Sequence, residues 1–220
     1  PTADEEVFQW VEQKVYRVMA GALANDFPIL EFIGGRKKKD SLYTKLLSKP
    51  DVSASQIYDK VRFRIVTRSS ADIFPVLNYV QRSLVPFNFV IPGQSTNTLL
   101  RFHDYCQSEP ELARLVPDLQ LPLDIEDGLS AIDNRFTAPS YRVVHFIADV
   151  PVRVPDNVLA QAPEATADLG HTIFVQTEFQ VIDRETDESN EAGDASHRAY
   201  KARQKLAVMH RLKVGRYIKS

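Results

Sequence analysis

A carboxylate and a carboxamide interrupt the apolar stretch at residues 172–182. Glu178 and Gln180 stand two positions apart in a segment otherwise rich in Ile, Phe and Val. In a β-strand, residues two apart point to the same face, so the two polar side chains are expected to lie together. Burying a carboxylate costs free energy unless a cation or hydrogen-bond donors meet it. The stretch therefore predicts a sheet strand that carries a functional carboxylate, with Mg²⁺ as one candidate partner.

A second block combines a basic cluster with another carboxylate beside a strand. The run from Arg36 to Lys39 follows two glycines, and Asp59 precedes the alternating apolar segment 61–67. Phosphate oxygens bind to such cations, and a glycine turn permits a close approach. On the residues alone, the basic run is more typical of a solvated helix start, and structural ion pairs are the more common role for carboxylates such as Asp59 and Glu178.

The apolar periodicity predicts helices interleaved with strands. Helices are expected at 4–24, 41–47, 53–58, 69–83 and 191–211, with helix candidates at 98–106 and 110–116, and strands are expected at 61–67, 85–91, 141–151 and 172–182. This order predicts an α/β fold of the α+β kind, with helices packed on a central mixed sheet. A chain of 220 residues fits a single domain over 1–220.

The composition excludes several classes of protein. With Cys106 as the single cysteine, no disulfide forms within the chain, and a cysteine-based metal site is not expected. A single free thiol is compatible with a reducing compartment, and we expect a cytoplasmic protein. No apolar run approaches the roughly 18 residues of a membrane span. The net charge of −2 gives no general argument for nucleic-acid binding, but residues 195–220 contain basic residues and no Asp or Glu.

The ordered set of these residues resembles the synthetase domain of the RelA/SpoT alarmone synthetases. The matches, in chain order, are Arg36, Lys38, Ser41, Lys45, Asp59, Arg64, Tyr141, His145, Glu178, Gln180, Glu191, Gly193, His197, Tyr200 and Lys201. They cover roughly residues 30–202. The resemblance implies the nucleotidyltransferase-like fold of that family, and it marks 94–133 as an insertion. No hydrolase or regulatory segment is evident, so a synthetase-only unit is expected, and a homo-oligomer is compatible with the sequence.

The resemblance also implies an activity. A Mg²⁺-dependent pyrophosphokinase of this family transfers the β,γ-pyrophosphate of ATP to a ribose 3′-hydroxyl, by default that of GDP or GTP, giving (p)ppGpp. It implies that Asp59 and Glu178 are the catalytic pair: Asp59 holds Mg²⁺, and Glu178 also holds it or prepares the acceptor 3′-hydroxyl for attack. It implies an ATP site in which Arg36 and Arg64 sandwich the adenine, completed by Lys38, Ser41 and Lys45.

On the acceptor side, the resemblance implies that Tyr141 stacks on guanine. His145, Gln180 and His197 would complete the acceptor site. The sequence departs from the family pattern mainly here: residues 138–140 replace a Lys and an Asn-Gly pair, Ile182 replaces an Arg, and Asn190 replaces an Ala.

Two alternatives follow from these departures. The first keeps the chemistry but transfers pyrophosphate to adenine nucleotides or to the 3′ end of tRNA, a toxin-like activity that fits the acid-free basic segment at 195–220. The second is a catalytically inactive module that binds a nucleotide. Retention of both Asp59 and Glu178 argues against the second alternative.

Overall fold

The computed structural model describes residues 4–36, 47, 60–100, 106–107, 110–114, 136–163 and 170–217. The helices predicted at 41–47 and 53–58 lie outside these residues except for Leu47, and most of the interval 94–133 lies outside them as well.

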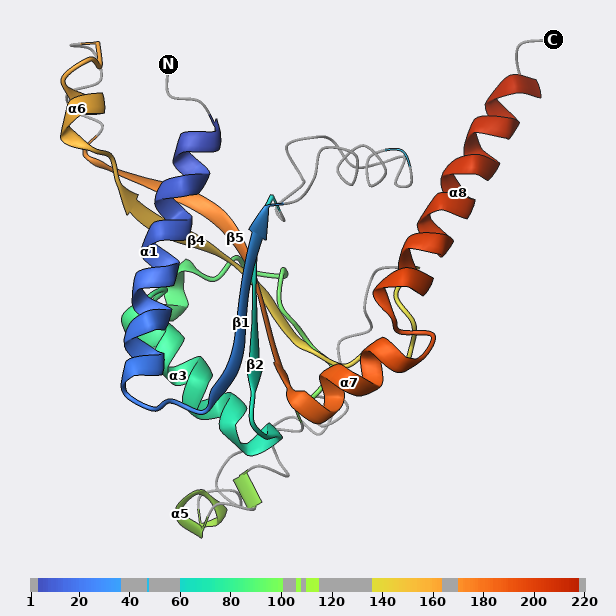
Figure 1. Ribbon diagram of the computed structural model, residues 1–220, viewed down its shortest axis with the longest axis horizontal. Coiled ribbons are helices and arrows are strands. Elements are labelled where there is room, and N and C mark those ends of the chain that lie inside the picture. Colours follow the sequence, from blue (N-terminus) through green and yellow to red (C-terminus); the bar gives the residue numbers. More distant parts are fainter. Residues whose placement is uncertain are drawn as a thin grey trace.

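In the described part of the chain, five strands form one mixed sheet in the order β1-β2-β5-β4-β3 (Figure 1). The strands are β1 (Ile29–Arg36), β2 (Val61–Thr67), β3 (Thr96–Asn97), β4 (Val144–Arg153) and β5 (Thr172–Asp183). The β2–β5 pair is parallel, and the other neighbouring pairs are antiparallel. The mixed sheet predicted from the sequence is thereby confirmed.

Helices lie on both sides of this sheet. They are α1 (Asp4–Ala24), α3 (Ile73–Ser83), α5 (Pro110–Ala113), α6 (Asp156–Leu159), α7 (Arg184–Ala192) and α8 (His197–Tyr217), with 3₁₀ turns η2 (Ser70–Asp72) and η3 (Phe87–Phe89). In Figure 1, α1 and α3 cover one side, whereas α7 packs at the end of β2 and β5 on the other side and α8 projects away from the sheet.

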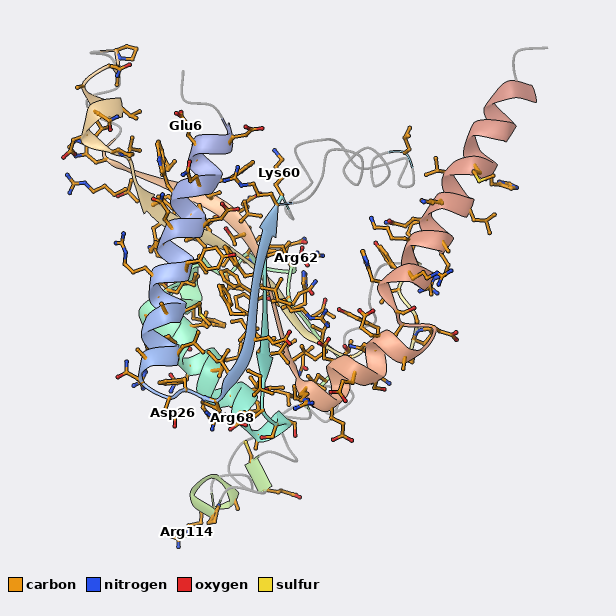
Figure 2. The ribbon with its side chains drawn as sticks, in the orientation of Figure 1. Glu6, Asp26, Lys60, Arg62, Arg68 and Arg114 are labelled. Carbon is orange, nitrogen blue, oxygen red and sulfur yellow. The ribbon has the colours of Figure 1, made fainter. Side chains whose placement is uncertain are left out.

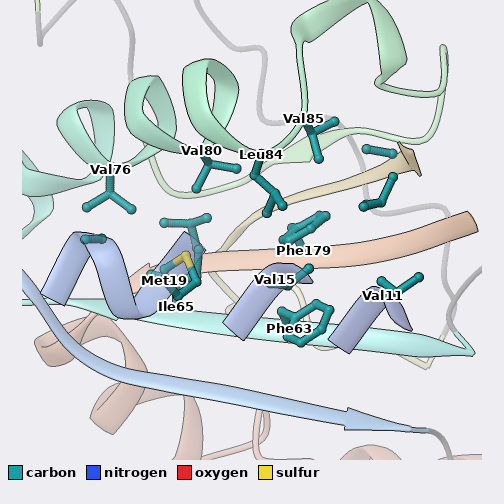
Figure 3. Packing of buried hydrophobic residues seen from close by; sticks show 14 of the residues in the cluster. Val11, Val15, Met19, Phe63, Ile65, Val76, Val80, Leu84, Val85 and Phe179 are labelled. Atoms are coloured by element: carbon teal, nitrogen blue, oxygen red, sulfur yellow. The ribbon is translucent and has the colours of Figure 1, made fainter. Parts of the chain in front are cut away.

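The core lies between the sheet and the α1–α3 layer. Figure 3 shows valines of both helices packed against Phe63 of β2 and Phe179 of β5. Phe63 and Phe179 stack with their ring centroids 5.8 Å apart, and the aromatic row continues to Phe32 at 5.5 Å from Phe63 and to Phe146 at 5.2 Å from Phe179. Successive side chains of a strand point to opposite faces of the sheet. Because Phe63 and Phe179 face the core, the polar residues next to them in β2 and β5 face the opposite side.

Several element predictions are confirmed and two are corrected. Helix 4–24 and strand 61–67 have the predicted bounds, and strand 172–182 is one residue longer. The strand predicted at 85–91 is wrong: Pro86 precedes the 3₁₀ turn Phe87–Phe89, and only Val90 makes an isolated bridge, to Ala148. Proline has no N–H for a strand ladder, so apolar content alone does not extend the strand through it.

The helix predicted at 191–211 is two helices. α7 ends at Ala192, Gly193 has extended backbone angles, and α8 begins at His197. Ser196 caps the new helix, because its Oγ accepts a hydrogen bond from the Ala199 N–H at 3.3 Å. The break turns α8 away from the sheet (Figure 1).

Candidate functional site

Polar side chains stand in register on the sheet face opposite α1 and α3. Arg62 and Arg64 of β2 lie directly beside Glu178 and Gln180 of β5, and His145 of β4 pairs with Gln180 on the other side. Cross-strand partners point to the same face of a sheet. These five residues, named here the central polar cluster, therefore occupy one surface in the middle of the sheet, and Figure 2 labels Arg62 on the α8 side of β1.

Glu178 is the buried carboxylate of the cluster. Glu178 is 5% exposed, and its Oε1 accepts a hydrogen bond from Gln180 Nε2 at 2.6 Å. The same oxygen lies 3.3 Å from His145 Nε2. A carboxylate fixed in this way can accept a proton from a substrate hydroxyl or bind a divalent cation. The structure thus brings together four of the residues selected from the sequence: Arg64, His145, Glu178 and Gln180.

Arg64 is held from the side by α7. Its Nη2 pairs with the carboxylate of Asp187, and each side chain is 22% exposed. The Nε of Arg64 is buried and has no hydrogen-bond partner among the described residues. Within the described residues, Arg64 therefore keeps one buried donor unpaired beside Glu178 and Gln180, which is uncommon for a buried polar atom.

Sequence reasoning missed Arg62 and Asp187 as parts of this site. The signal for Arg62 was present, because Arg62 and Arg64 alternate with the buried Val61, Phe63 and Ile65. Asp187 reaches Arg64 because α7 packs against β2, a contact between residues far apart in the sequence. No local sequence pattern could therefore predict its place in the site.

Tyr141 lies just before β4, half-buried at the edge of the cluster. Burial raises the pKa of the Tyr141 phenol, and the charges of Glu178 and Glu191 add to this rise while Arg64 and Arg62 oppose it. These electrostatic neighbours place Tyr141 within reach of the central polar cluster.

His197, the first residue of α8, also interacts electrostatically with the arginines of the central polar cluster. Burial lowers the pKa of its imidazole, and the positive charges of Lys201, Arg62 and Arg64 lower it further, whereas Glu191 opposes the shift. The turn between α7 and α8 thus positions His197 near the arginines of β2.

Arg36 lies on the opposite face of the sheet from the central polar cluster. In the β1–β2 ladder it stands opposite the core residue Val61, so its side chain is on the face that α1 covers. Its Nε and Nη2 both donate to the carboxylate of Glu12 on α1, each at 2.8 Å, and this contact raises the pKa of the guanidinium. The structure therefore does not bring Arg36 together with Arg64, the pair expected to enclose adenine.

Four residues selected from the sequence lie outside the described part of the chain: Lys38, Ser41, Lys45 and Asp59. Their roles remain predictions. Among the described residues, no group of three or more His, Cys, Asp or Glu side chains is arranged to hold a metal ion. Mg²⁺ in phosphoryl-transfer sites needs only one or two carboxylates, with substrate phosphates and water supplying the other ligands. The chemistry of Glu178 fits that requirement.

Asn190, one of the departures from the family pattern, has a structural role. It is 3% exposed, its Oδ1 accepts from the Arg142 N–H at 3.1 Å, and its Nδ2 donates to the Arg142 carbonyl at 2.8 Å. This two-way contact ties α7 to the segment next to Tyr141. An alanine at this position would leave both backbone groups without that partner.

Comparison with known proteins gives structural neighbours only. No family model and no curated protein matches the chain. The crystal structure of small alarmone synthetase 2 from Bacillus subtilis matches with a TM-score of 0.51 and 15% identity, covering 98% of this chain and 92% of that one. Small alarmone synthetase 1 from the same organism matches with a TM-score of 0.46 and 12% identity, over 98% of this chain and 89% of that one.

The likeness to small alarmone synthetase 2 shows a shared fold. The expected α/β fold of the nucleotidyltransferase-like kind is thereby confirmed, and so is the family resemblance at the level of the fold. None of the described helices is both long and apolar enough to cross a lipid bilayer.

Proposed function

We propose that this protein is a pyrophosphokinase, which transfers the β,γ-pyrophosphate of ATP to a ribose 3′-hydroxyl with the help of Mg²⁺. The observation that carries the proposal is the buried Glu178 carboxylate. Gln180 and His145 hold it, and Arg62 stands beside it on an alarmone-synthetase fold. The default acceptor is GDP or GTP, as the family resemblance implies.

The arrangement of charges suits the donor. The polar side chains are ordered across the cluster: two arginines lie on β2, Glu178 and the neutral Gln180 on β5, and His145 on β4. Guanidinium groups bind phosphate oxygens through two N–H bonds at once, so the β2 side favours the triphosphate of ATP. The acceptor hydroxyl then approaches from the β4 side, beside the carboxylate and the imidazole.

The reaction needs positioning and charge neutralisation more than covalent participation by the protein. The 3′-hydroxyl attacks the β-phosphorus of ATP in line, the bond from that phosphorus to the α-phosphate oxygen breaks, and AMP leaves. Glu178 orients the hydroxyl and accepts its proton, and Arg62 and Arg64 stabilise the charge on the phosphates. Glu178, together with Asp59, would hold Mg²⁺, which supplies further charge neutralisation at the phosphates when bound.

A second candidate function keeps this chemistry and changes the acceptor to the 3′ end of tRNA. α8 runs from His197 to Tyr217 with no Asp or Glu, and it projects away from the sheet. A basic helix of this kind favours a polyanion, and RNA affinity that falls steeply with added salt would support the assignment.

The test uses ATP labelled in its γ-phosphate, Mg²⁺ and a panel of GDP, GTP, ADP, ATP and bulk tRNA. Label that appears in one acceptor together with released AMP supports the proposal and identifies the substrate. The variants Glu178→Gln and Asp59→Ala should abolish this transfer. ATP binding without label in any acceptor would replace the proposal with an inactive nucleotide-binding module.

A further inference from the structure

Helix α7 makes two side-chain contacts that reach opposite sides of β5. Its Asp187 pairs with Arg64 of β2, and its Asn190, one turn further on, hydrogen-bonds to the backbone of Arg142, two residues before β4. Positions three apart in a helix lie on the same side of it. Because β5 separates β2 from β4 in the sheet, one side of α7 connects two parts of the chain that are not neighbours in the sheet (Figure 1).

The segment that carries Tyr141 lies outside the strand ladder. β4 begins at Val144, and no residue of β5 pairs with 141–143. Thr98 holds Val143, because its Oγ1 accepts a hydrogen bond from the Val143 N–H at 2.9 Å, and Asn190 holds the residue before it. The position of Tyr141 relative to β5 therefore depends on these side-chain contacts.

Asn190 makes a contact that few side chains can reproduce. It is 3% exposed and lies in the last turn of α7, although asparagine is unfavourable inside helices. A carboxamide donates and accepts at the same time, so it bonds to both the N–H and the carbonyl of Arg142, as a neighbouring strand would. The residue type therefore serves the position of that segment rather than the stability of the helix.

Two departures from the family pattern meet at this contact. Residues 138–140 lie directly before Tyr141, and Asn190 stands where the pattern has Ala. The Tyr141 N–H donates to the Ala138 carbonyl at 3.0 Å, so the altered residues form the turn that leads into the segment. An alanine at 190 could make neither hydrogen bond, so this restraint belongs to this chain and accompanies its altered turn.

We propose that Asn190 is a positioning residue of the acceptor side, which fixes Tyr141 through the backbone of Arg142. The same helix ties this position to that of Arg64, because Asp187 and Asn190 are one turn apart on α7. The inference rests on the proposed function, in which Arg64 binds the phosphates of ATP and the acceptor approaches from the β4 side. Asn190 touches no reacting group and acts only through the segment that it holds.

The first experiment measures amide hydrogen exchange of the full chain by NMR, without any nucleotide. In Asn190→Ala, the Arg142 N–H loses its acceptor and should exchange at least about fivefold faster. The amide of Phe179, in the middle of β5, reports global opening, and its rate should rise by a smaller factor. The matched control is Tyr79→Phe, which removes a hydrogen bond to the Val18 carbonyl on the other side of the sheet and should leave the ratio of the two rates unchanged.

The second experiment measures steady-state transfer from ATP to GDP. Asn190→Ala should raise KM for GDP roughly fivefold to tenfold, through the loss of two hydrogen bonds, and KM for ATP by less than about twofold. The double variant with Asp187→Asn should lose less in kcat/KM than the product of the two single losses, because both act through α7. A role in stability alone would not separate the two KM values.

A further variant guards against misfolding of Asn190→Ala. Thr98→Val removes only the hydroxyl that holds Val143, so it should also raise KM for GDP while leaving KM for ATP unchanged. A native KM for GDP in a folded Asn190→Ala or in Thr98→Val overturns the proposal. So does an Arg142 exchange rate that rises no more than that of Phe179, or a double variant whose losses simply multiply.

The native protein separates this inference from the proposed function. Transfer to GDP with an unchanged KM in Asn190→Ala would keep the pyrophosphokinase and remove Asn190 from the acceptor side. Faster Arg142 exchange in Asn190→Ala, together with no transfer to any acceptor by the native protein, would overturn the proposed function and reduce the α7 contact to a structural one.

Discussion

Gln180 donates a hydrogen bond from its Nε2 to Oε1 of Glu178 over 2.6 Å, between side chains two positions apart on one face of β5. The pairing fixes the direction of a carboxylate that is almost entirely buried. A carboxylate in that setting is costly to the fold, so its presence points to chemistry rather than to stability. This reasoning leads to the first prediction.

Glu178→Gln should separate activity from stability. The substitution keeps the shape of the side chain but removes the negative charge, so pyrophosphate transfer should fall by at least about 100-fold. The free energy of unfolding should stay level or rise by about 1 kcal/mol, because a buried charge is removed. Transfer assays and urea unfolding measure the two effects. Glu188→Gln is the control, since Glu188 is an exposed residue of α7 and its side chain is 68% exposed.

Asp187→Asn should loosen the contact between α7 and β2. Arg64 would lose its charged partner in a partly buried setting, which should cost about 1–2 kcal/mol in the free energy of unfolding. A less firmly held Arg64 should raise KM for ATP several-fold more than it changes kcat. The matched control is Asp156→Asn, whose exposed pair with Arg153 should be worth less than about 0.5 kcal/mol. Equal effects of the two variants would show that the Arg64–Asp187 contact contributes no more to stability or to ATP binding than an exposed ion pair.

His197 should make stability depend on pH on the acid side of neutrality. Burial and nearby cations hold its pKa below the ordinary value of about 6.5, so the unfolded chain binds a proton here more readily than the folded one. Its contribution to stability is therefore present above pH ~6.5 and is lost as the pH falls through the window between that value and the folded pKa. His197→Gln should flatten unfolding free energy against pH in that window. His197 is only partly buried and most of its side chain meets solvent, so the effect should be small and should shrink with added salt.

The His197 imidazole also offers a spectroscopic measure of the site. An NMR titration of its ring protons should give a pKa below the ordinary value, and binding of ATP should raise it, because the phosphates neutralise Arg62 and Arg64. A His197 pKa that ATP leaves unchanged would place the triphosphate away from these arginines.

The sequence pattern predicted the elements that local periodicity determines. The alternation of Val61, Phe63 and Ile65 defines β2, and the apolar run around Glu178 defines β5, so the unusual carboxylate could be recognised before its surroundings were known. The direction of Arg36 could not be predicted, because it depends on the β1–β2 register and on a partner in α1.

β1 itself was missed for a related reason. Gly34 and Gly35 were interpreted as a turn, because glycine weakens a strand on its own. The structure places both in β1, opposite Phe63 and Arg62 of β2. Pairing with β2 and packing against α1 override the local preference here, and both depend on residues far away in the sequence.

The two glycines differ in their surroundings, which gives the last prediction. A Cβ built on Gly34 would lie 2.5 Å from the Tyr16 hydroxyl and 2.7 Å from a ring carbon of Phe63, whereas a Cβ on Gly35 meets nothing within 4 Å. Phe63 is fully buried in the stacked aromatic row and cannot move aside. Gly34→Ala should therefore cost about 1–3 kcal/mol of unfolding free energy through overpacking, while Gly35→Ala should change it by less than about 0.5 kcal/mol. Urea unfolding of the two variants, side by side, measures the difference, and equal stabilities would contradict the close approach of α1 to β1 at Gly34.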